Sequence, residues 1–221
     1  MSNKQKKDYL SKFLLAVGLI FIIFSIAFLF LNHKRIELKK EESINLEKQI
    51  KQELPPFENY EQENRPEEIE QNVASKDSIK DTAIGVLRID KIGVITPISD
   101  NTSEQSLLEG SGIVEDTDIP TSEENTITVL AGHRGGINET QSFLNIDKLE
   151  KGDELKITTR EEELYYKVVD KEVIEPTDWS KFTREEGKTK LFLMACHPYP
   201  KNDKRLLVKA ELIKNDEEIN N

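Results

Sequence analysis

Hydrophobic and polar positions divide the chain into one long apolar segment, a charged segment, and a region of short alternating runs. The apolar segment, residues 13–31 (FLLAVGLIFIIFSIAFLFL), contains no charged residue. As a helix it would be about 28 Å long, close to the thickness of the hydrocarbon core of a bilayer. A buried core helix would show a polar stripe, and this segment has none. The pattern therefore predicts a transmembrane helix at residues 13–31.

A cleaved signal peptide is the main alternative to an anchor. Its apolar region usually has about 7–15 residues and ends at a cleavage site with small residues. Here the run is longer and leads into NHKRIELKK. Residues 1–12, which include four lysines and one aspartate, are expected to stay in the cytoplasm. We therefore expect a single-pass protein of the cell membrane whose larger, C-terminal part lies outside the cell.

Residues 32–80 are predicted to form a charged stalk and linker. The part KRIELKKEESINLEKQIKQEL has apolar residues at loose helical spacing, which is typical of a solvated helix, with a partner-binding coil as the alternative. The part PPFENYEQENRPEEIEQNVASKDS is polar and acidic with three prolines, as in flexible linkers.

Residues 81–213 show short runs of Ile, Val and Leu separated by turn residues. They predict strands in AIGVLRIDKIGVITPI, NTITVLAGHRG, DELKITTREEELYYKVVDKEVIEP (a hairpin leading into a further strand), KTKLFLMAC and KRLLVKAELI. TSEQSLLEG and SFLNIDKLEKG are the expected short helices. Strands and helices do not alternate, which argues against a doubly wound fold, and an all-β, closed or nearly closed barrel is expected. Residues 214–221 form a polar tail with no second membrane span.

Composition narrows the function classes. A net charge of −11 argues against nucleic-acid binding, which requires a basic surface. The single cysteine excludes an intrachain disulfide. A lone thiol outside the cell is open to oxidation, so its presence there suggests a chemical role.

Cys196 ends the apolar run KLFLMAC and is the candidate nucleophile. A free thiol ionises near pH 8.5, so a nucleophilic cysteine needs a base or a positive charge nearby. An inert core cysteine is the alternative, because cysteine is among the residue types most often buried.

Histidine can supply the proton carrier. His133 follows TITVLAG and precedes RGG, where a strand breaks into a glycine-rich loop that can present a catalytic group. A structural histidine at the barrel rim is the alternative reading of His133. His197 adjoins Cys196, but neighbouring side chains on a strand point to opposite faces, unless Pro198 bends the chain. His133 is therefore preferred, and His33 is expected to be an interfacial residue beside the membrane span.

Arg205 opens the strand that follows Cys196. If the two strands pair antiparallel, Cys196 and Arg205 face each other, and the guanidinium would hold a substrate or stabilise an oxyanion. A surface arginine paired with an acid such as Asp203 is the alternative. Acyl transfer from an amide needs a nucleophile, a proton carrier and oxyanion stabilisation, and Cys196, His133 and Arg205 supply one of each.

At these residues the chain resembles the sortases, the cysteine transpeptidases of Gram-positive cell surfaces. LFLMAC resembles the family motif T-L-x-T-C without its two threonines, GHRG resembles the histidine motif, and CHPYPKNDKRLLV resembles the C-x-P-Y…R-L-L-V segment of pilin-type and related sortases. The resemblance implies an eight-stranded barrel with Cys196 as nucleophile, His133 as general acid and candidate base, and Arg205 as stabiliser. Ala195 replaces the threonine before the cysteine, which puts the local hydrogen bonding of substrate in question.

The resemblance also implies the partners. They are surface proteins with an LPxTG-like sorting signal, cleaved after the threonine through a thioacyl intermediate, and an acceptor amine from a peptidoglycan precursor or a pilin lysine. RPEE and LPPF do not supply the D-P-aromatic lid of pilin-polymerising members, and no second span is present, which favours protein anchoring over pilus building. No cofactor is predicted, because the acidic residues form no convincing calcium loop.

Two other readings remain open at this level. L,D-transpeptidases also use Cys, His and Arg, but in an S-x-G-C-[IV]-R-like motif whose arginine follows the cysteine by two residues, whereas Arg205 follows Cys196 by nine. A non-catalytic, membrane-tethered binding module with an inert cysteine is the second.

Overall fold

The computed structural model describes residues 3–54, 83–135 and 143–213, with side chains from residue 12 onward. The chain divides into two compact units, residues 1–39 and 40–221, and each is described by itself. The linker predicted up to residue 80, the sequence RPEE, most of LPPF and the tail at 214–221 lie outside the described residues.

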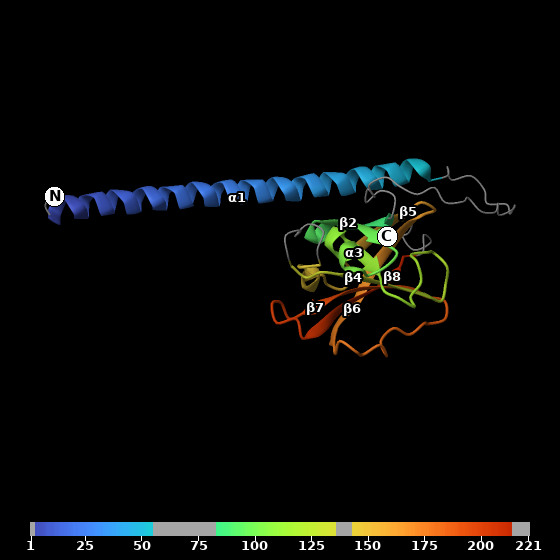
Figure 1. Cartoon of the computed structure of the whole chain (residues 1–221). Coiled ribbons are helices and arrows are strands. Elements are labelled where there is room, and N and C mark those ends of the chain that lie inside the picture. The colour runs from blue at the N-terminus through green and yellow to red at the C-terminus, as the bar shows by residue number, and fades with distance from the viewer. Residues whose placement is uncertain (1–2, 55–82, 136–142, 214–221) are drawn as a thin grey trace. The chain divides into compact units, whose positions relative to one another are not determined.

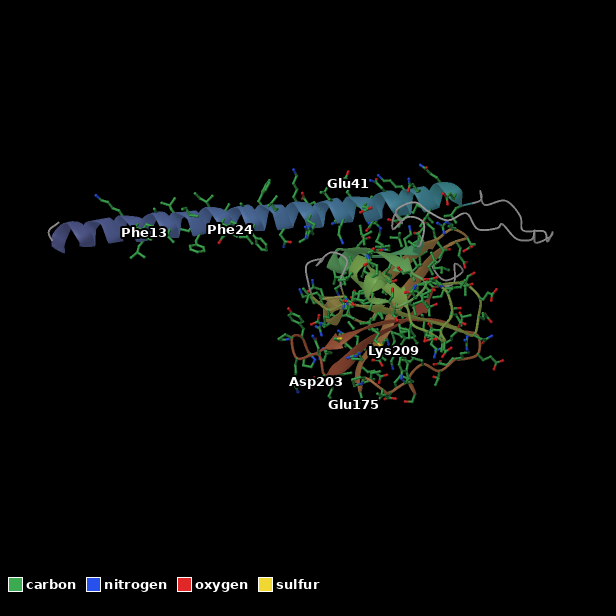
Figure 2. All side chains as sticks on the ribbon, in the orientation of Figure 1. Phe13, Phe24, Glu41, Glu175, Asp203 and Lys209 are labelled. Carbon is green, nitrogen blue, oxygen red and sulfur yellow. The ribbon has the colours of Figure 1, made fainter. Side chains whose placement is uncertain are left out.

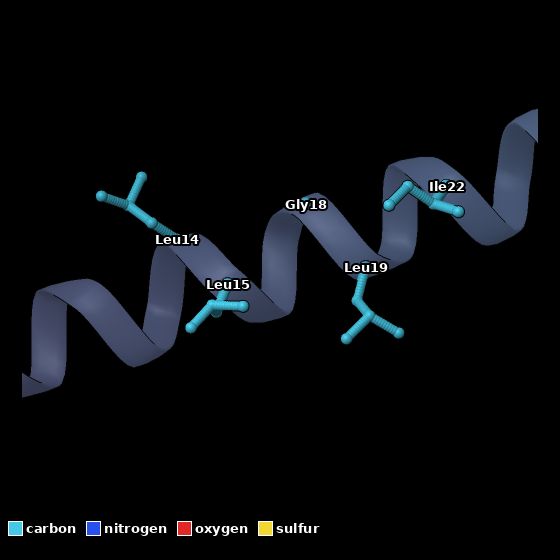
Figure 3. Close-up of a pocket in the computed structure, with 5 residues that line it drawn as sticks. All are labelled: Leu14, Leu15, Gly18, Leu19 and Ile22. Carbon is cyan, nitrogen blue, oxygen red and sulfur yellow. The ribbon is translucent and has the colours of Figure 1, made fainter.

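Helix α1 (Asn3–Glu53) contains the predicted span. The Phe, Leu and Ile side chains of residues 13–31 are exposed, among them Phe13 and Phe24 (Figure 2). The side chains of Leu14, Leu15, Leu19 and Ile22, which surround Gly18, are exposed as well (Figure 3). Among the described residues, α1 is the one helix that is both long enough and apolar enough to cross a membrane. Such a surface suits lipid tails, which supports a membrane anchor.

Eight strands in the described part of the chain close into one barrel, which confirms the predicted fold class (Figure 1). The order around the barrel is β1-β2-β3-β4-β7-β8-β6-β5. Neighbours are antiparallel except for the parallel pairs β2–β3 and β4–β7. The strands are β1 (Ala83–Ile89), β2 (Val94–Ser99), β3 (Ser111–Ile113), β4 (Thr126–Gly132), β5 (Glu154–Thr159), β6 (Glu163–Ile174), β7 (Thr189–His197) and β8 (Lys204–Leu212).

Most strands coincide with the segments expected from the sequence, and the differences are local. Strand β3 was not predicted, because three residues are too few to show alternation. Strand β6 is one strand of 12 residues instead of a hairpin arm and a further strand. TSEQSLLEG contains helix α3 (Glu104–Glu109), whereas the described part of SFLNIDKLEKG contains only the 3₁₀ turn η2 (Ile146–Lys148).

Alternation along the strands produces two apolar layers. Leu191 and Leu193 of β7 belong to a cluster that draws residues from every strand and therefore fills the barrel interior. Phe192 and Met194, between and after them, belong to a second cluster on the outer face of β4, β7 and β8. This outer apolar layer follows β7 towards its C-terminal end.

The last turns of α1 belong to the second unit and pack on the barrel. Leu46 and Ile50 are only 4% and 2% exposed, and they form a cluster with Ala83, Val86 and Ile95. The prediction of a solvated helix is therefore wrong for this end of α1. Leu46 and Ile50 are four residues apart, so they lie on one helix face, and that face covers β1 and β2.

Ionic contacts hold the same helix end. Glu47 is buried and accepts hydrogen bonds from Arg88. Lys51 of α1 and Lys156 of β5 each lie 2.8 Å from the Glu163 carboxylate. Burial opposes ionisation of Glu163, but the two ammonium groups outweigh it and lower its pKa to about 2.

Replacing Glu163 with glutamine should therefore lower the free energy of unfolding near neutral pH and make that free energy less dependent on pH in the acidic range. A folded-state pKa below the ordinary 4.5 contributes stability above that pH, which is lost as the pH falls towards 2. After allowance for solvent screening, we expect Glu163→Gln to lower the free energy of unfolding by about 1–2 kcal/mol at pH 7 and by almost nothing near pH 2. Urea unfolding of the full chain in detergent at several pH values measures this.

Glu161→Gln is the matched control, since Glu161 is exposed and makes no ion pair with the described residues. A Glu163→Gln deficit that stays constant between pH 7 and pH 2 would contradict the assignment.

Candidate active site

Cys196 lies at the end of β7, on the outer face of the barrel. Leu193 and Ala195 belong to the interior cluster and Met194 to the outer one, so alternation places Cys196 on the same side as Met194. Cys196 is a free thiol and is partly exposed. The inert-cysteine alternative requires a sulfur buried in the apolar interior of the barrel. The sulfur of Cys196 does not lie there.

Arg205 is the direct cross-strand partner of Cys196 in the antiparallel pair β7–β8, as the sequence predicted. Paired residues of this kind share one face of the sheet. One guanidinium nitrogen of Arg205 donates to the carbonyl of Lys204 at 3.0 Å, and no carboxylate within the described ranges pairs with it. Asp203, the acid considered as its partner, pairs with Lys201 instead. Most of the donors of Arg205 remain available beside the thiol.

His133 follows directly on β4, the parallel neighbour of β7. Ala131 pairs with Met194, so two residues further along each strand His133 is level with Cys196. His133 is exposed, and its imidazole makes no hydrogen bond to the part of the chain described here. Its carbonyl accepts a hydrogen bond from the Phe143 amide at 2.8 Å, which fixes the backbone and leaves the ring free. The alternative of a satisfied rim histidine does not fit this geometry.

Glycine is needed just before this histidine. A Cβ at Gly132 would lie 2.7 Å from the ring of Phe143, which is fully buried. Only a residue without a side chain allows Phe143 to pack this closely on the end of β4.

His197 is held by another residue. Its Nδ1 is hydrogen-bonded to the guanidinium of Arg134, the residue that follows His133. Arg134 also donates to the carbonyl of Leu144 at 3.2 Å and pairs with Asp147 at 2.8 Å. The structure thus distinguishes the two candidate histidines: the ring of His133 has no hydrogen-bond partner among the described residues, whereas the ring of His197 is held by Arg134.

The loop after β4 also lies against the β7–β8 loop. Gly135 has a φ of +96°, and a Cβ there would lie 2.8 Å from the ring of Tyr199. The sequence showed Arg134 and Gly135 within GHRG, but their contacts with the β7–β8 loop could not be read from the motif.

The outer apolar cluster lies beneath the face that leads to the thiol. Its members Val129, Phe192 and Leu207 are at most 2% exposed. Phe182 of the β6–β7 loop packs edge-on against Phe192, with ring centroids 5.2 Å apart, and Trp179 is 55% exposed beside it.

The β6–β7 loop is tied to the segment before β4. Arg184 donates both terminal nitrogens to the carboxylate of Asp118, and these hydrogen bonds lower the pKa of Asp118 despite its partial burial. Arg184 also donates to the carbonyl of Asn125 at 2.9 Å.

Within the described residues, no group of three or more His, Cys, Asp or Glu side chains is arranged to hold a metal ion.

Comparison with solved structures finds the same fold and related sequences. A group B Streptococcus Pilus Island 1 sortase C2 is 40% identical with a TM-score of 0.58, over 60% of this chain and 75% of that one. A Clostridium perfringens sortase C, solved with the C-terminal cell wall sorting motif, is 33% identical with a TM-score of 0.56, over 60% and 71%.

Sequence comparisons agree with the structural ones. Sortase D of Bacillus subtilis (strain 168) is 33% identical over 117 residues, which is 53% of this chain. The chain spans little more than half of that relative, 56% of its length. The family model described as the sortase domain matches residues 87–213, more than half of the chain. The chain therefore belongs to the sortase family.

Proposed function

We propose that the protein is a membrane-anchored cysteine transpeptidase that cleaves an LPxTG-like sorting signal and transfers the cleaved protein to an amine. The observation that carries this proposal is the register at the end of the barrel. Cys196 pairs directly with Arg205, and His133 is level with Cys196 on the parallel neighbour. A nucleophile, a cationic donor and an unengaged imidazole thus share one rim.

In the first half-reaction the thiolate of Cys196 attacks the carbonyl carbon of the scissile amide. The oxygen becomes an oxyanion, which the free N–H donors of Arg205 stabilise. His133 gives its proton to the leaving nitrogen, the C–N bond breaks, and the acyl group remains on sulfur as a thioester.

In the second half-reaction an amine attacks the thioester carbonyl. The C–S bond breaks, the thiolate of Cys196 leaves, and the proton released by the amine returns to His133. The products are a new amide and the enzyme in its starting protonation state. Water in place of the amine gives hydrolysis, so the choice between transfer and hydrolysis depends on access of the amine to the thioester.

The comparisons and the helix α1 support this function. The comparison with a sortase C solved with a cell wall sorting motif supports a peptide ligand of this class. A span at residues 13–31 with a cytoplasmic N-terminus would place the barrel at the outer face of the membrane, where surface proteins and lipid-linked amine donors meet.

The direct test uses the full chain in detergent with a panel of LPxTG-like peptides and two kinds of acceptor, a peptidoglycan-type amine and a lysine-containing pilin peptide. Mass spectrometry should find cleavage after the threonine and a product joined to one of the amines. Absence of both cleavage and a thioester-linked protein across the panel would overturn the proposal.

Replacing Arg205 with lysine should lower kcat by about 100- to 1,000-fold. Lysine keeps the positive charge but lacks the planar fork that can donate to an oxyanion while also binding the Lys204 carbonyl. Arg160→Lys, the same change in an exposed arginine at the β5–β6 turn, is the control and should turn over normally. Near-normal kcat in Arg205→Lys would reduce the role of Arg205 to its charge alone.

A further inference from the structure

Arg134 is a buried cation next to the candidate proton carrier. Its side chain is only 6% exposed, although it lies in the loop that follows β4. Burying a guanidinium is costly unless its donors are satisfied. The position of Arg134 therefore depends on its hydrogen-bond partners.

Those partners come from two other segments of the chain. The carbonyl of Leu144 lies on the segment just before η2, and the carboxylate of Asp147 belongs to η2 itself. The Nδ1 of His197 lies at the end of β7, one residue beyond Cys196. A single guanidinium therefore links the backbone that carries His133 to the backbone that carries Cys196.

The chemistry of the contact with His197 is defined. A guanidinium has only donors, so Nδ1 of His197 must accept, and the proton of the neutral imidazole is on Nε2. The planar fork directs donors to three partners at once, which an ammonium group cannot do with the same geometry. Tyr199 adds a second contact between the same two loops, because its ring packs on Gly135.

We propose that Arg134 is a positioning residue that holds the His133 imidazole at working distance from the Cys196 thiol. The inference rests on the proposed transpeptidase function. Arg134 does not touch the reacting atoms. Arg134 fixes the loop that presents His133 against the end of β7. Without the hydrogen bonds of Arg134, His133 would no longer be aligned with Cys196 and Arg205.

The test compares Arg134→Lys and Arg134→Gln with wild type in the peptide cleavage assay, using the full chain in detergent. We expect kcat to fall by about 10- to 100-fold, while KM changes by less than about threefold, because misalignment affects the transition state more than peptide binding. Alkylation of Cys196 by iodoacetamide and the thermal midpoint report whether the folded site is retained. Arg160→Gln is the remote control.

A double variant separates positioning from a general loss of fold. Once Arg134 is glutamine, the contact with His197 is gone, so adding His197→Ala should cause no further loss of kcat. If the two changes multiply instead, Arg134 does not act through this network. Wild-type kcat in Arg134→Gln would also overturn the inference.

Asp147→Asn covers the case in which the Arg134 variants do not fold. Asp147 is 45% exposed, so its substitution should leave the fold intact, weaken one arm of the network, and lower kcat by about three- to tenfold at unchanged KM. Unchanged kcat in Asp147→Asn would then count against the proposal. An inactive wild type would instead refute the proposed function, so the two failures are distinguishable.

Discussion

Replacing Cys196 with alanine is expected to abolish cleavage of sorting-signal peptides and to leave the barrel folded. The chain has no second cysteine, so nothing else can form the thioester. The rate should fall by at least about 1,000-fold, below detection in most assays. Because the side chain is only partly buried, its truncation should change the free energy of unfolding by about 1 kcal/mol or less. Peptide turnover by mass spectrometry and thermal unfolding measure the two effects.

The same experiment decides between an enzyme and a tethered binding module. An inert cysteine would resist iodoacetamide in the folded protein. Cys196 is partly exposed on the outer face, so it should react in the folded protein, and peptide turnover should fall in proportion to the fraction of Cys196 that is alkylated. Cys196→Ser, which keeps the size of the side chain but not its nucleophilicity, should be as inactive as alanine. Retained cleavage in Cys196→Ala would exclude Cys196 as the nucleophile.

The sequence predicted the barrel because most of its strands carry their own signal. Strands such as β4 and β7 are short runs of β-branched and apolar residues bounded by turn or polar residues. Strand β3 was missed because its pairing with β2 and β4 is set by the tertiary fold, not by its three residues.

The docked end of α1 was missed for a related reason. Leu46 and Ile50 are two apolar positions in a strongly charged segment, which alone resembles a solvated helix. Their burial depends on the matching surface at Val86 and Ile95, which only the folded barrel provides. Pattern reveals that a helix has an apolar face, but not which surface covers it.

The part of the candidate site whose strands are joined by one short loop could be predicted from the sequence. A short loop between two strands enforces antiparallel pairing, so the opposition of Cys196 and Arg205 followed from the sequence. The parallel neighbour that brings His133 level with Cys196 is joined to β7 only through β5, β6 and their loops, so no local rule gives its register. The contacts of Arg134 were equally hidden, because its partners lie up to 63 positions away.

Replacing His133 with alanine should lower kcat for peptide cleavage strongly, whereas replacing His197 with alanine should lower it only slightly. The imidazole of His133 is exposed and level with Cys196, whereas that of His197 is bound by Arg134. Loss of a general acid lowers kcat by about 100- to 10,000-fold, while loss of one arm of the Arg134 network should cost no more than about tenfold. Peptide turnover of both variants, with His33→Ala in α1 as a remote control, gives the ranking.

The leaving group provides the sharper test of the role of His133. If His133 protonates the departing nitrogen, a substrate with an activated ester at the scissile position needs no such proton. His133→Ala should then form the thioester from the ester far faster than from the amide, and the gap between variant and wild type should narrow by about 100-fold. An equal deficit on both substrates would assign His133 to activation of the Cys196 thiol instead, and a severe His197→Ala would transfer the proton-carrying role to the other histidine.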